Sequence, residues 1–420
     1  MKQLAFFILL CYSAISAAAP YQDTTPGADI RTVQFYPADA QASNQLDLPV
    51  IFLRGEKTMR MEFDELGSQY YNYNFKLIHC NRDWEQSILN DFEFLEGYNE
   101  FFVEDYALSL NTRTAYTHYT INVPKVKVSG NYILMVYRNQ NQSEIAITRR
   151  FVVYDNNVTI SLDPKFPLDP AWRFTGQQID FKLLYGEFPL YNPVQTVDVV
   201  LRQNGRWDNA FNNLKPMFLK EDEKTMDYHF FNNENLFPGL NEYRGFDIRS
   251  FRFRGQNIAE TRFDNQKAEA WVIPDKPRKQ TALTQWIDAN GRFVIENFET
   301  RQGAVEADYV NTYFSFETDS EVNGDIYIFG LLSNWTLNPD FRMKKIEGKN
   351  RYETMLKLKQ GFYNYSYVLV NPGMKTDETI FEGTYNQAEN LYDVITYFRP
   401  IGARYDHVIG YAAVDYNKLR

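Results

Sequence analysis

Three short runs of the sequence place arginine beside a carboxylate and an aromatic ring, and these are the residues most able to do chemistry. They are Arg82, Asp83 and Trp84 in HCNRDW (79–84), Arg206, Trp207 and Asp208 in QNGRWDNA (203–210), and Tyr243 and Arg244 in NEYRGFD (241–247). A guanidinium can pair with a carboxylate and stack on an aromatic ring at the same time. Such a network can pin a loop or bind a partner. Both interpretations stay open, and loop pinning is the favoured one.

Residues for catalysis or metal binding are scarce. The sequence has no G-x-S-x-G elbow, phosphate-binding loop, H-E-x-x-H or G-x-G-x-x-G motif. The four histidines are far apart and there are two cysteines, which is not a typical set of zinc ligands. We therefore expect no catalytic residue, no metal and no cofactor. A hydrolase with an unrecognised carboxylate pair stays as one hypothesis, because a glycosidase needs two carboxylates and no motif.

The composition indicates the elements that must position these motifs. The chain has 420 residues, a formal net charge of −10 and 33 Phe and 30 Tyr. The acidic balance argues against a nucleic-acid-binding protein, which would show a basic face. Aromatic residues favour strands, and short strand-like segments with turns between them are typical of β-sandwiches. In one such segment Tyr71, Tyr73, Phe75 and Leu77 share a face.

We predict an all-β protein made of tandem β-sandwich domains of immunoglobulin-like or early-set-like type. The length favours several domains, and Pro274–Lys279 has the composition of a linker. The expected division is an N-terminal sandwich at 20–156, a second sandwich at 157–275, a linker with a lead-in strand at 276–305, and a C-terminal early-set-like sandwich at 306–420.

The first residues are typical of a secretory signal peptide. Lys2 is followed by an apolar run at 4–10 and by small residues at 13–19. The run is too short to span a membrane, and Leu10 before Cys11 disfavours lipidation at that cysteine. We expect cleavage near residue 19, export, no transmembrane segment, and Cys80 as the one cysteine of the mature chain.

The motifs taken together resemble the plug protein family of the Bacteroidetes type IX secretion system. The resemblance rests on HCNRDW, QNGRWDNA and NEYRGFD, with SLNTRTAYTHY at 109–119 and SGNY at 129–132 between them. It implies a non-enzymatic periplasmic protein at the inner face of the outer membrane. It also implies a partner, the giant outer-membrane translocon β-barrel, whose periplasmic opening the plug closes when no cargo passes. No catalytic role follows for any residue.

A second likeness concerns the C-terminal part. FGLLSNW at 329–335 and GFYNYSYV at 361–368 resemble the early-set β-sandwich of glycogen- and starch-binding modules. Trp335 falls where one sugar-stacking Trp lies in those modules, and the stretch 371–375 lacks an aromatic residue for the second. The alternative function is therefore a glycan-binding protein accessory to polysaccharide capture, although we do not expect carbohydrate as the main ligand. Trp335 joins the motif residues as a candidate for partner contact or loop pinning.

Overall fold

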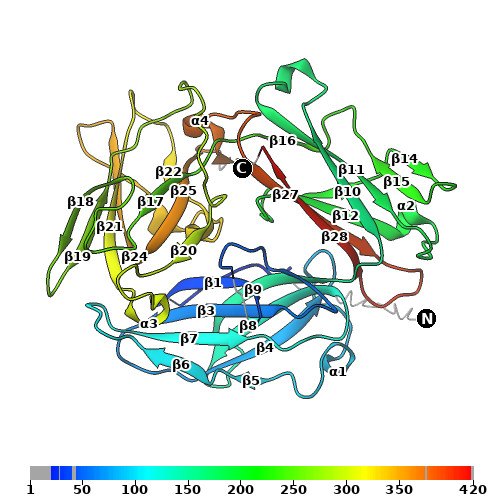
Figure 1. Cartoon of the computed structure of the whole chain (residues 1–420), viewed down its shortest axis with the longest axis horizontal. Coiled ribbons are helices and arrows are strands. Elements are labelled where there is room, and N and C mark those ends of the chain that lie inside the picture. The colour runs from blue at the N-terminus through cyan, green and yellow to red at the C-terminus, as the bar shows by residue number, and fades with distance from the viewer. Residues whose placement is uncertain (1–19, 28, 40–43, 374–375, 418–420) are drawn as a thin grey trace, which may run out of the picture.

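Three β-sandwich domains lie around a common centre and give the chain a triangular outline (Figure 1). This computed structural model describes residues 20–27, 29–39, 44–373 and 376–417, so the predicted signal peptide lies outside the described residues. The prediction of an all-β protein with tandem sandwiches is confirmed, since the described helices are short and each sheet packs against another. Among the described residues, no helix has the length and apolar character to cross a membrane.

Domain 1 (residues 20–155) contains two sheets. The first has the order β1 (Ile30–Ala38), β3 (Thr58–Leu66), β7 (Tyr116–Asn122) and β6 (Asp105–Leu108). The second has the order β2 (Val50–Phe52), β9 (Ile145–Tyr154), β8 (Gly130–Arg138), β4 (Tyr73–Cys80) and β5 (Phe101–Phe102), with α1 (Asp91–Phe94) following β4. An aromatic-rich core that includes Phe63, Tyr73 and Tyr119 fills the space between them.

Domain 2 is built from two separate parts of the chain. One sheet contains β10 (Thr159–Lys165), β11 (Gly176–Leu184), β15 (Thr225–Tyr228) and β14 (Phe218–Lys220), with β16 (Leu236–Pro238) paired to β11. The other has the order β13 (Phe211–Leu214), β12 (Val197–Gln203), β27 (Asn390–Phe398) and β28 (His407–Tyr416), with the short α2 (Pro193–Thr196) leading into β12. The two C-terminal strands, red in Figure 1, therefore lie among the green strands of domain 2.

Domain 3 occupies the chain between these two parts. One sheet has the order β17 (Arg244–Asp247), β25 (Gly361–Val370) and β20 (Phe293–Ile295), with β22 (Asp325–Phe329) and β26 (Thr376–Asp377) also paired to β25. The other has the order β18 (Ile258–Phe263), β19 (Ala268–Val272), β21 (Tyr309–Glu317), β24 (Arg351–Lys359) and β23 (Lys344–Lys345). The short helices are α3 (Gly303–Glu306) and α4 (Thr379–Glu382).

The domain borders expected from the sequence at 157–275 and 306–420 cut across these sheets. Strands β17 to β19 fall in the expected second domain, but β17 pairs with β25 and β19 pairs with β21 of the third. Strands β27 and β28 fall in the expected third domain, but β27 pairs with β12 of the second along seven register positions. We therefore propose domain 2 as 156–240 plus 384–417, and domain 3 as 241–383 inserted into it. The expected lead-in strand of the 276–305 segment corresponds to β20.

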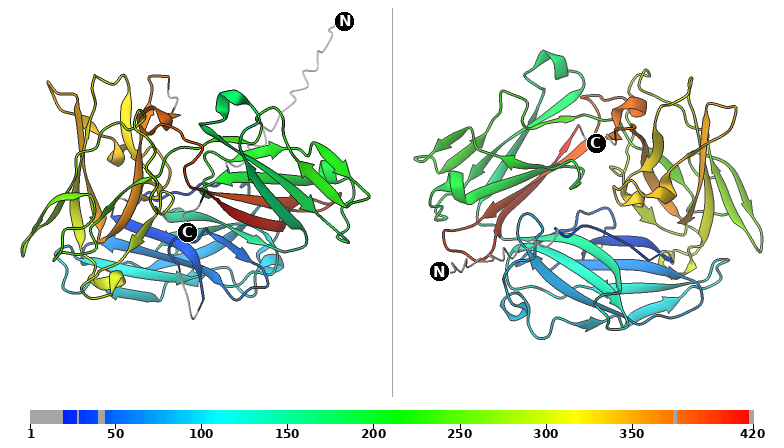
Figure 2. Two further views of the ribbon diagram at one scale, coloured as in Figure 1. Left: turned by 45° about the horizontal axis from the view of Figure 1, so that its top comes forward. Right: turned by 180° about the vertical axis from the view of Figure 1, so that it is seen from behind.

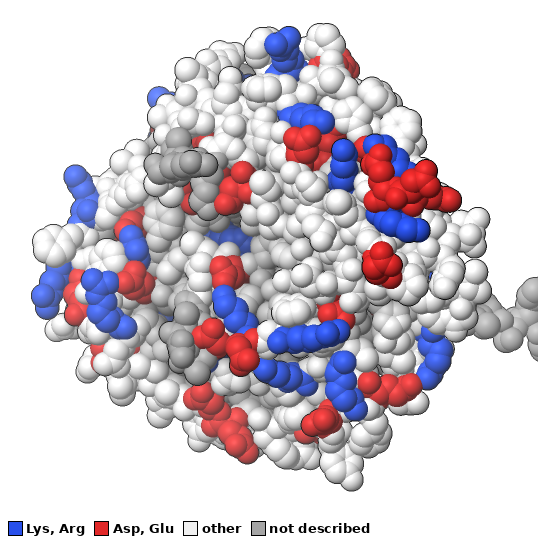
Figure 3. All heavy atoms as spheres, turned by 45° about the vertical axis from the view of Figure 1, so that its right-hand side comes forward, with Lys and Arg blue, Asp and Glu red and all other residues white. Residues whose placement is uncertain are grey.

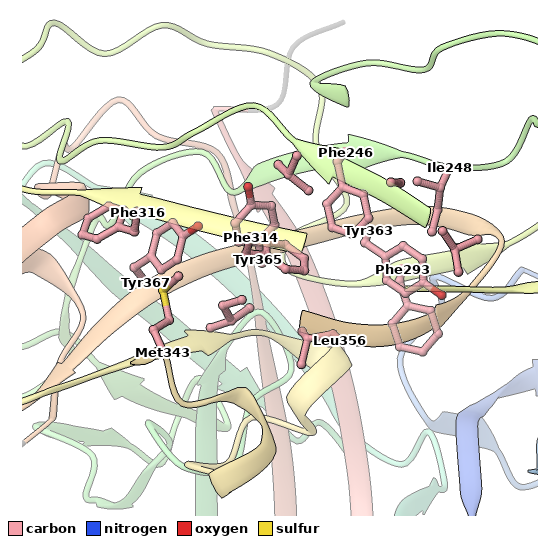
Figure 4. Packing of buried hydrophobic residues seen from close by; sticks show 14 of the residues in the cluster. Phe246, Ile248, Phe293, Phe314, Phe316, Met343, Leu356, Tyr363, Tyr365 and Tyr367 are labelled. Carbon is pink, nitrogen blue, oxygen red and sulfur yellow. The ribbon is translucent and has the colours of Figure 1, made fainter. Parts of the chain in front are cut away.

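The domains are held together in two different ways. An apolar cluster joins domain 1 to domain 2 and includes Ile133 and Val152 from one side and Val200 and Ile395 from the other. The sheet that contains β8 is therefore covered on both faces, and β8 is buried at every position except its last. Domain 3 has its own aromatic core, in which Phe246 stacks on Tyr363 (Figure 4). Ion pairs join it to domain 1, through Lys359 and Asp64, and to domain 2, through Glu378 and Arg206.

Candidate functional site at the domain junction

A tryptophan from each of two sequence motifs, Trp84 and Trp207, packs edge to face where domain 1 joins domain 2. Trp84 follows β4 and has a left-handed backbone with φ of 68°, and Trp207 lies in the loop after β12. Their ring centroids are 4.8 Å apart at 84°. The guanidinium of Arg150, from β9, lies 5.4 Å from both rings and donates to the carboxylate of Asp23 at 2.9 and 3.0 Å. This stack fixes the N-terminal segment, β9 and both motif loops against one another.

Arg206 connects domain 2 to domain 3. Its side chain has no exposed surface and donates to Asp208 at 2.5 and 3.1 Å and to Glu378 at 2.7 and 2.8 Å. The same guanidinium lies 4.7 Å from the ring of Trp335. Bidentate pairing with two carboxylates and stacking on a ring use the full donor fork of arginine. A long buried side chain fixed in this way holds the loop of QNGRWDNA against the C-terminal part of domain 3.

Trp335 and Tyr243 complete this contact from domain 3. Trp335 follows a 3₁₀ turn with φ of 54°, its ring lies 5.9 Å from that of Tyr243, and its edge packs on Gly291. Tyr243 is buried, and Asn204 donates to its hydroxyl. Because the Arg206 guanidinium covers one face of the Trp335 ring, that face is not open for stacking a sugar, which counts against the glycan-binding alternative.

The other three predicted residues lie apart from this cluster. Arg82 bridges domain 1 to domain 2, because its guanidinium donates to the carbonyl of Asn212 at 2.8 Å. Asp83 is exposed, and its carboxylate accepts a hydrogen bond from the backbone N–H of Glu85 in the same turn. Arg244 lies within domain 3, where it donates to Asp275 and Glu382 at 2.7 and 2.9 Å. The choice between partner contact and loop pinning stays a prediction for all nine residues, and the geometry favours loop pinning for the buried ones.

A buried charged network joins domain 1 to domain 3. Asp64 accepts from Lys359, His118 and Tyr309, each at 2.7 Å. Burial opposes ionisation of Asp64, but Lys359 and His118 outweigh it and lower the pKa of the carboxyl. Burial lowers the pKa of Lys359, and the charge of Asp64 only partly offsets this. The network ties β3 and β7 to β21 and β24, because Lys359 and Tyr309 of domain 3 both contact Asp64 of domain 1.

Sequence reasoning missed several charged residues that the fold buries close to the motifs. Arg202 and Asp393 are register partners on β12 and β27, and both side chains are fully buried. Arg149 and Arg292 are also buried. One signal was available, since the doublet Arg149–Arg150 interrupts an otherwise apolar strand and must send one arginine to each face. The pairing of Arg202 with Asp393 carries no local signal, because the residues are 191 positions apart.

Two carboxyl groups next to the junction have raised pKa values. Burial raises the pKa of Glu242 to about 7 and that of Asp288 to about 6, and the charge of Glu389 adds to both. Arg278 opposes these shifts. Perturbed carboxyls can mark a catalytic site, but here Asp288 accepts two backbone N–H groups and holds a turn. In the described part of the chain, no group of three His, Cys, Asp or Glu residues could hold a metal ion.

The chain is similar to a known protein family in domain 1 and to a solved structure over nearly its whole length. Residues 30–155, which contain the sheets of domain 1, match the family model described as the type 9 secretion system plug protein 1st domain. A crystal structure of a hypothetical protein from Parabacteroides merdae is similar over the whole fold, with a TM-score of 0.88 and 31% identity, and covers 95% of this chain and 100% of that one. A marsupial T cell receptor matches with a TM-score of 0.15 and 7% identity over 88% of this chain and 98% of that one. No curated protein matches the chain.

Proposed function

Because the chain belongs to the type IX secretion system plug protein family, we propose that it binds the outer-membrane translocon barrel of that system and closes its periplasmic opening when no cargo passes. We further propose that it acts in the periplasm, without catalysis and without a cofactor. The family match supports a plug role in type IX secretion, and the features below support the finer parts of the proposal.

The observation that carries the proposal is the locked arrangement of the three domains. A plug must be wider than one sandwich and must keep its shape while it occludes an opening. Here an apolar cluster joins domains 1 and 2, the Asp64 network joins domains 1 and 3, and Arg206 joins domains 2 and 3. Seen from behind, the domains meet at the same centre (Figure 2). Three fastened interfaces make one broad body from three small domains.

We place the barrel contact at the apolar tip of domain 2. The loop between β10 and β11 projects at the outer edge of the molecule (Figure 1) and exposes Phe166, Leu168 and Phe174 at 53–73%. Phe231, 60% exposed, lies on the adjacent loop. Exposed aromatic residues clustered on fixed loops are suited to act as hot spots in a reversible protein contact.

Hydrogen bonds within and between the two loops fix the backbone of the tip, as expected for a recognition surface. Asp169 caps the short turn within the first loop and accepts from Asn233 of the second at 3.0 Å. Gln178 donates to the carbonyl of Phe230 at 2.8 Å. The aromatic side chains are therefore presented by backbone that is already ordered, so that less conformational entropy is lost on binding.

Affinity isolation from native outer membranes tests the barrel contact. With mild crosslinking, the chain should retain a barrel protein much larger than itself. The variant Phe166→Ser with Phe174→Ser should lose most of that recovery. The matched control Phe253→Ser changes an equally exposed ring on domain 3 and should keep it. Absence of a large barrel protein from the isolate would overturn the proposed partner, and equal recovery with all variants would overturn the proposed surface.

Membrane permeability tests the gating. Cells without the protein should take up small solutes through the translocon when no cargo occupies it, and the wild-type gene should restore the barrier. Unchanged permeability in the deletion strain would refute the closing function.

A further inference from the structure

A cavity of about 310 Å³ lies where the three domains meet. Its lining comes from every domain and includes Arg149 and Arg150 of β9, Arg206 and Trp207 after β12, and Arg292 and Trp335 of domain 3. The space-filling view shows the molecule hollowed left of centre, with a basic side chain recessed in the hollow (Figure 3). The volume lies at the lower end of the range for small-molecule sites.

The charge of the lining is opposite to that of the whole chain. Four arginines line the cavity and two aspartates, Asp23 and Asp208, accompany them, whereas the chain has a net charge of −10. Both aspartates are already engaged by arginine, Asp23 by Arg150 and Asp208 by Arg206. The remaining two arginines, Arg149 and Arg292, carry the excess positive charge.

Arg149 and Arg292 make no ion pair with any described residue. Arg149 donates to the carbonyls of Thr24 and Thr148 and to the hydroxyl of Thr25, each at 2.9 Å. Arg292 donates to the carbonyl of Asn204 at 3.2 Å. Burial lowers the pKa of each guanidinium to about 10. The charge of Asp23 only partly offsets this for Arg149, and that of Asp393 only partly offsets it for Arg292, where the charge of Arg202 adds to the lowering.

Burying a guanidinium without a direct ion pair is costly, and two such side chains line this one cavity. We propose that the three-domain cavity binds a small organic anion, with a carboxylate or phosphate group held by Arg149 and Arg292. Arginine forks match the geometry of both groups. Val33, Phe35 and Leu331 also line the cavity, so that a short apolar portion of the ligand has a matching surface.

The position of the site gives the ligand a structural consequence. Arg149 belongs to domain 1 and Arg292 to domain 3, and residues 206–208 of domain 2 also line the cavity. An anion that touches both unpaired arginines therefore bridges the domains and stabilises their arrangement. This inference does not depend on the proposed partner, since it rests on the cavity alone.

Binding measurements on the chain without its first 19 residues test the proposal. The probes are phenyl phosphate, citrate and inorganic phosphate, with sodium chloride at matched ionic strength as the control. We expect phenyl phosphate or citrate to bind with a Kd below about 1 mM by calorimetry and to raise the thermal unfolding midpoint saturably. Each should also change the tryptophan fluorescence, because Trp207 and Trp335 line the cavity.

Two variants locate the binding. Arg292→Gln and Arg149→Gln should each weaken probe binding about 10-fold or more, whereas Arg54→Gln, at an exposed arginine of domain 1, should leave it unchanged. Soaking crystals of the unmodified chain with phenyl phosphate should place the phosphate between Arg149 and Arg292, a readout that needs no variant to fold. No shift beyond the chloride control, equal binding by all variants, or density elsewhere would each overturn the proposal.

Discussion

The ion pair of Arg202 and Asp393 allows a quantitative test of how the domain junction is held. The two residues face each other across β12 and β27, and neither side chain has exposed surface. Nε of Arg202 donates to both carboxylate oxygens at 3.1 and 3.2 Å, while Nη1 is buried without a hydrogen-bond partner. The variant Asp393→Asn keeps the shape and one acceptor but removes the charge that neutralises the guanidinium.

The expected cost follows from that geometry. Removing one partner of a buried ion pair costs about 3–5 kcal/mol because the other charge is left uncompensated, and the retained amide oxygen places the value near the lower end. The free energy of unfolding of a domain of this size falls by about 1–3 kcal/mol per molar urea, so the urea concentration at the unfolding midpoint should fall by about 1–3 M. Tryptophan fluorescence reports the transition locally, because the Trp207 ring lies 4.2 Å from the Arg202 guanidinium carbon.

Two further variants decide whether the reasoning is correct. Glu260→Gln removes an exposed pair with Arg262 and should change stability by less than about 1 kcal/mol. The double variant Arg202→Met with Asp393→Leu removes both buried charges and should lie within about 1–2 kcal/mol of the unmodified chain. The argument fails if Asp393→Asn costs no more than Glu260→Gln, or if the double variant is as unstable as the single one.

Three other outcomes are expected. Gly291→Ala should lower the free energy of unfolding by about 1–3 kcal/mol more than Gly402→Ala. Both glycines have positive φ, but only at Gly291 would the added Cβ lie 2.3 Å from the Trp335 ring. Equal losses of stability in urea melts would contradict this. Glu242→Gln should stabilise the chain by about 1–2 kcal/mol near pH 8 and by less near pH 5. The pKa of the Glu242 carboxyl is about 7 in the folded chain, so this group lowers stability progressively as the pH rises from the pKa of an unfolded glutamate to about 7. A difference that does not change with pH would refute the prediction. In a chain without the first 19 residues, Cys80 should resist a thiol reagent until the protein unfolds, because burial, with a smaller contribution from Asp83, raises the pKa of its thiol; fast labelling of the native state would count against this.

Local patterns predicted the strands well and their partners poorly. The alternation of Tyr73, Phe75 and Leu77 marked β4 correctly, since a period of two is a property of neighbouring residues. The stretch 246–253 alternates apolar with polar or charged residues, a pattern typical of a strand over its whole length, yet β17 ends at Asp247. There Arg249 donates back to Asp247 at 2.6 and 3.0 Å, and this local pair turns the chain.

Local patterns also predicted only those parts of the candidate site whose residues are neighbours in the sequence. Runs that mix arginine, carboxylate and aromatic side chains drew attention to Arg206, Trp207 and Tyr243, which the structure brings together. Nothing in the local sequence marks Glu378 and Asp393 as counter-charges, and only the fold places them at the junction. The assembly of a charged centre from three domains depends on contacts across hundreds of residues, which no local pattern records.

The return of the C-terminal strands to domain 2 has a consequence for how the chain acquires its structure. Gln203 and Tyr392 are register partners 189 residues apart, so β12 has only β13 beside it until the end of the chain has emerged. Domains 1 and 3 can each fold from a continuous stretch as they appear, while the half-finished domain 2 keeps an unpaired apolar edge that invites aggregation. The step that completes the molecule is therefore the docking of β27 and β28, and a chain cut short inside domain 3 would lack both, leaving domain 2 permanently open.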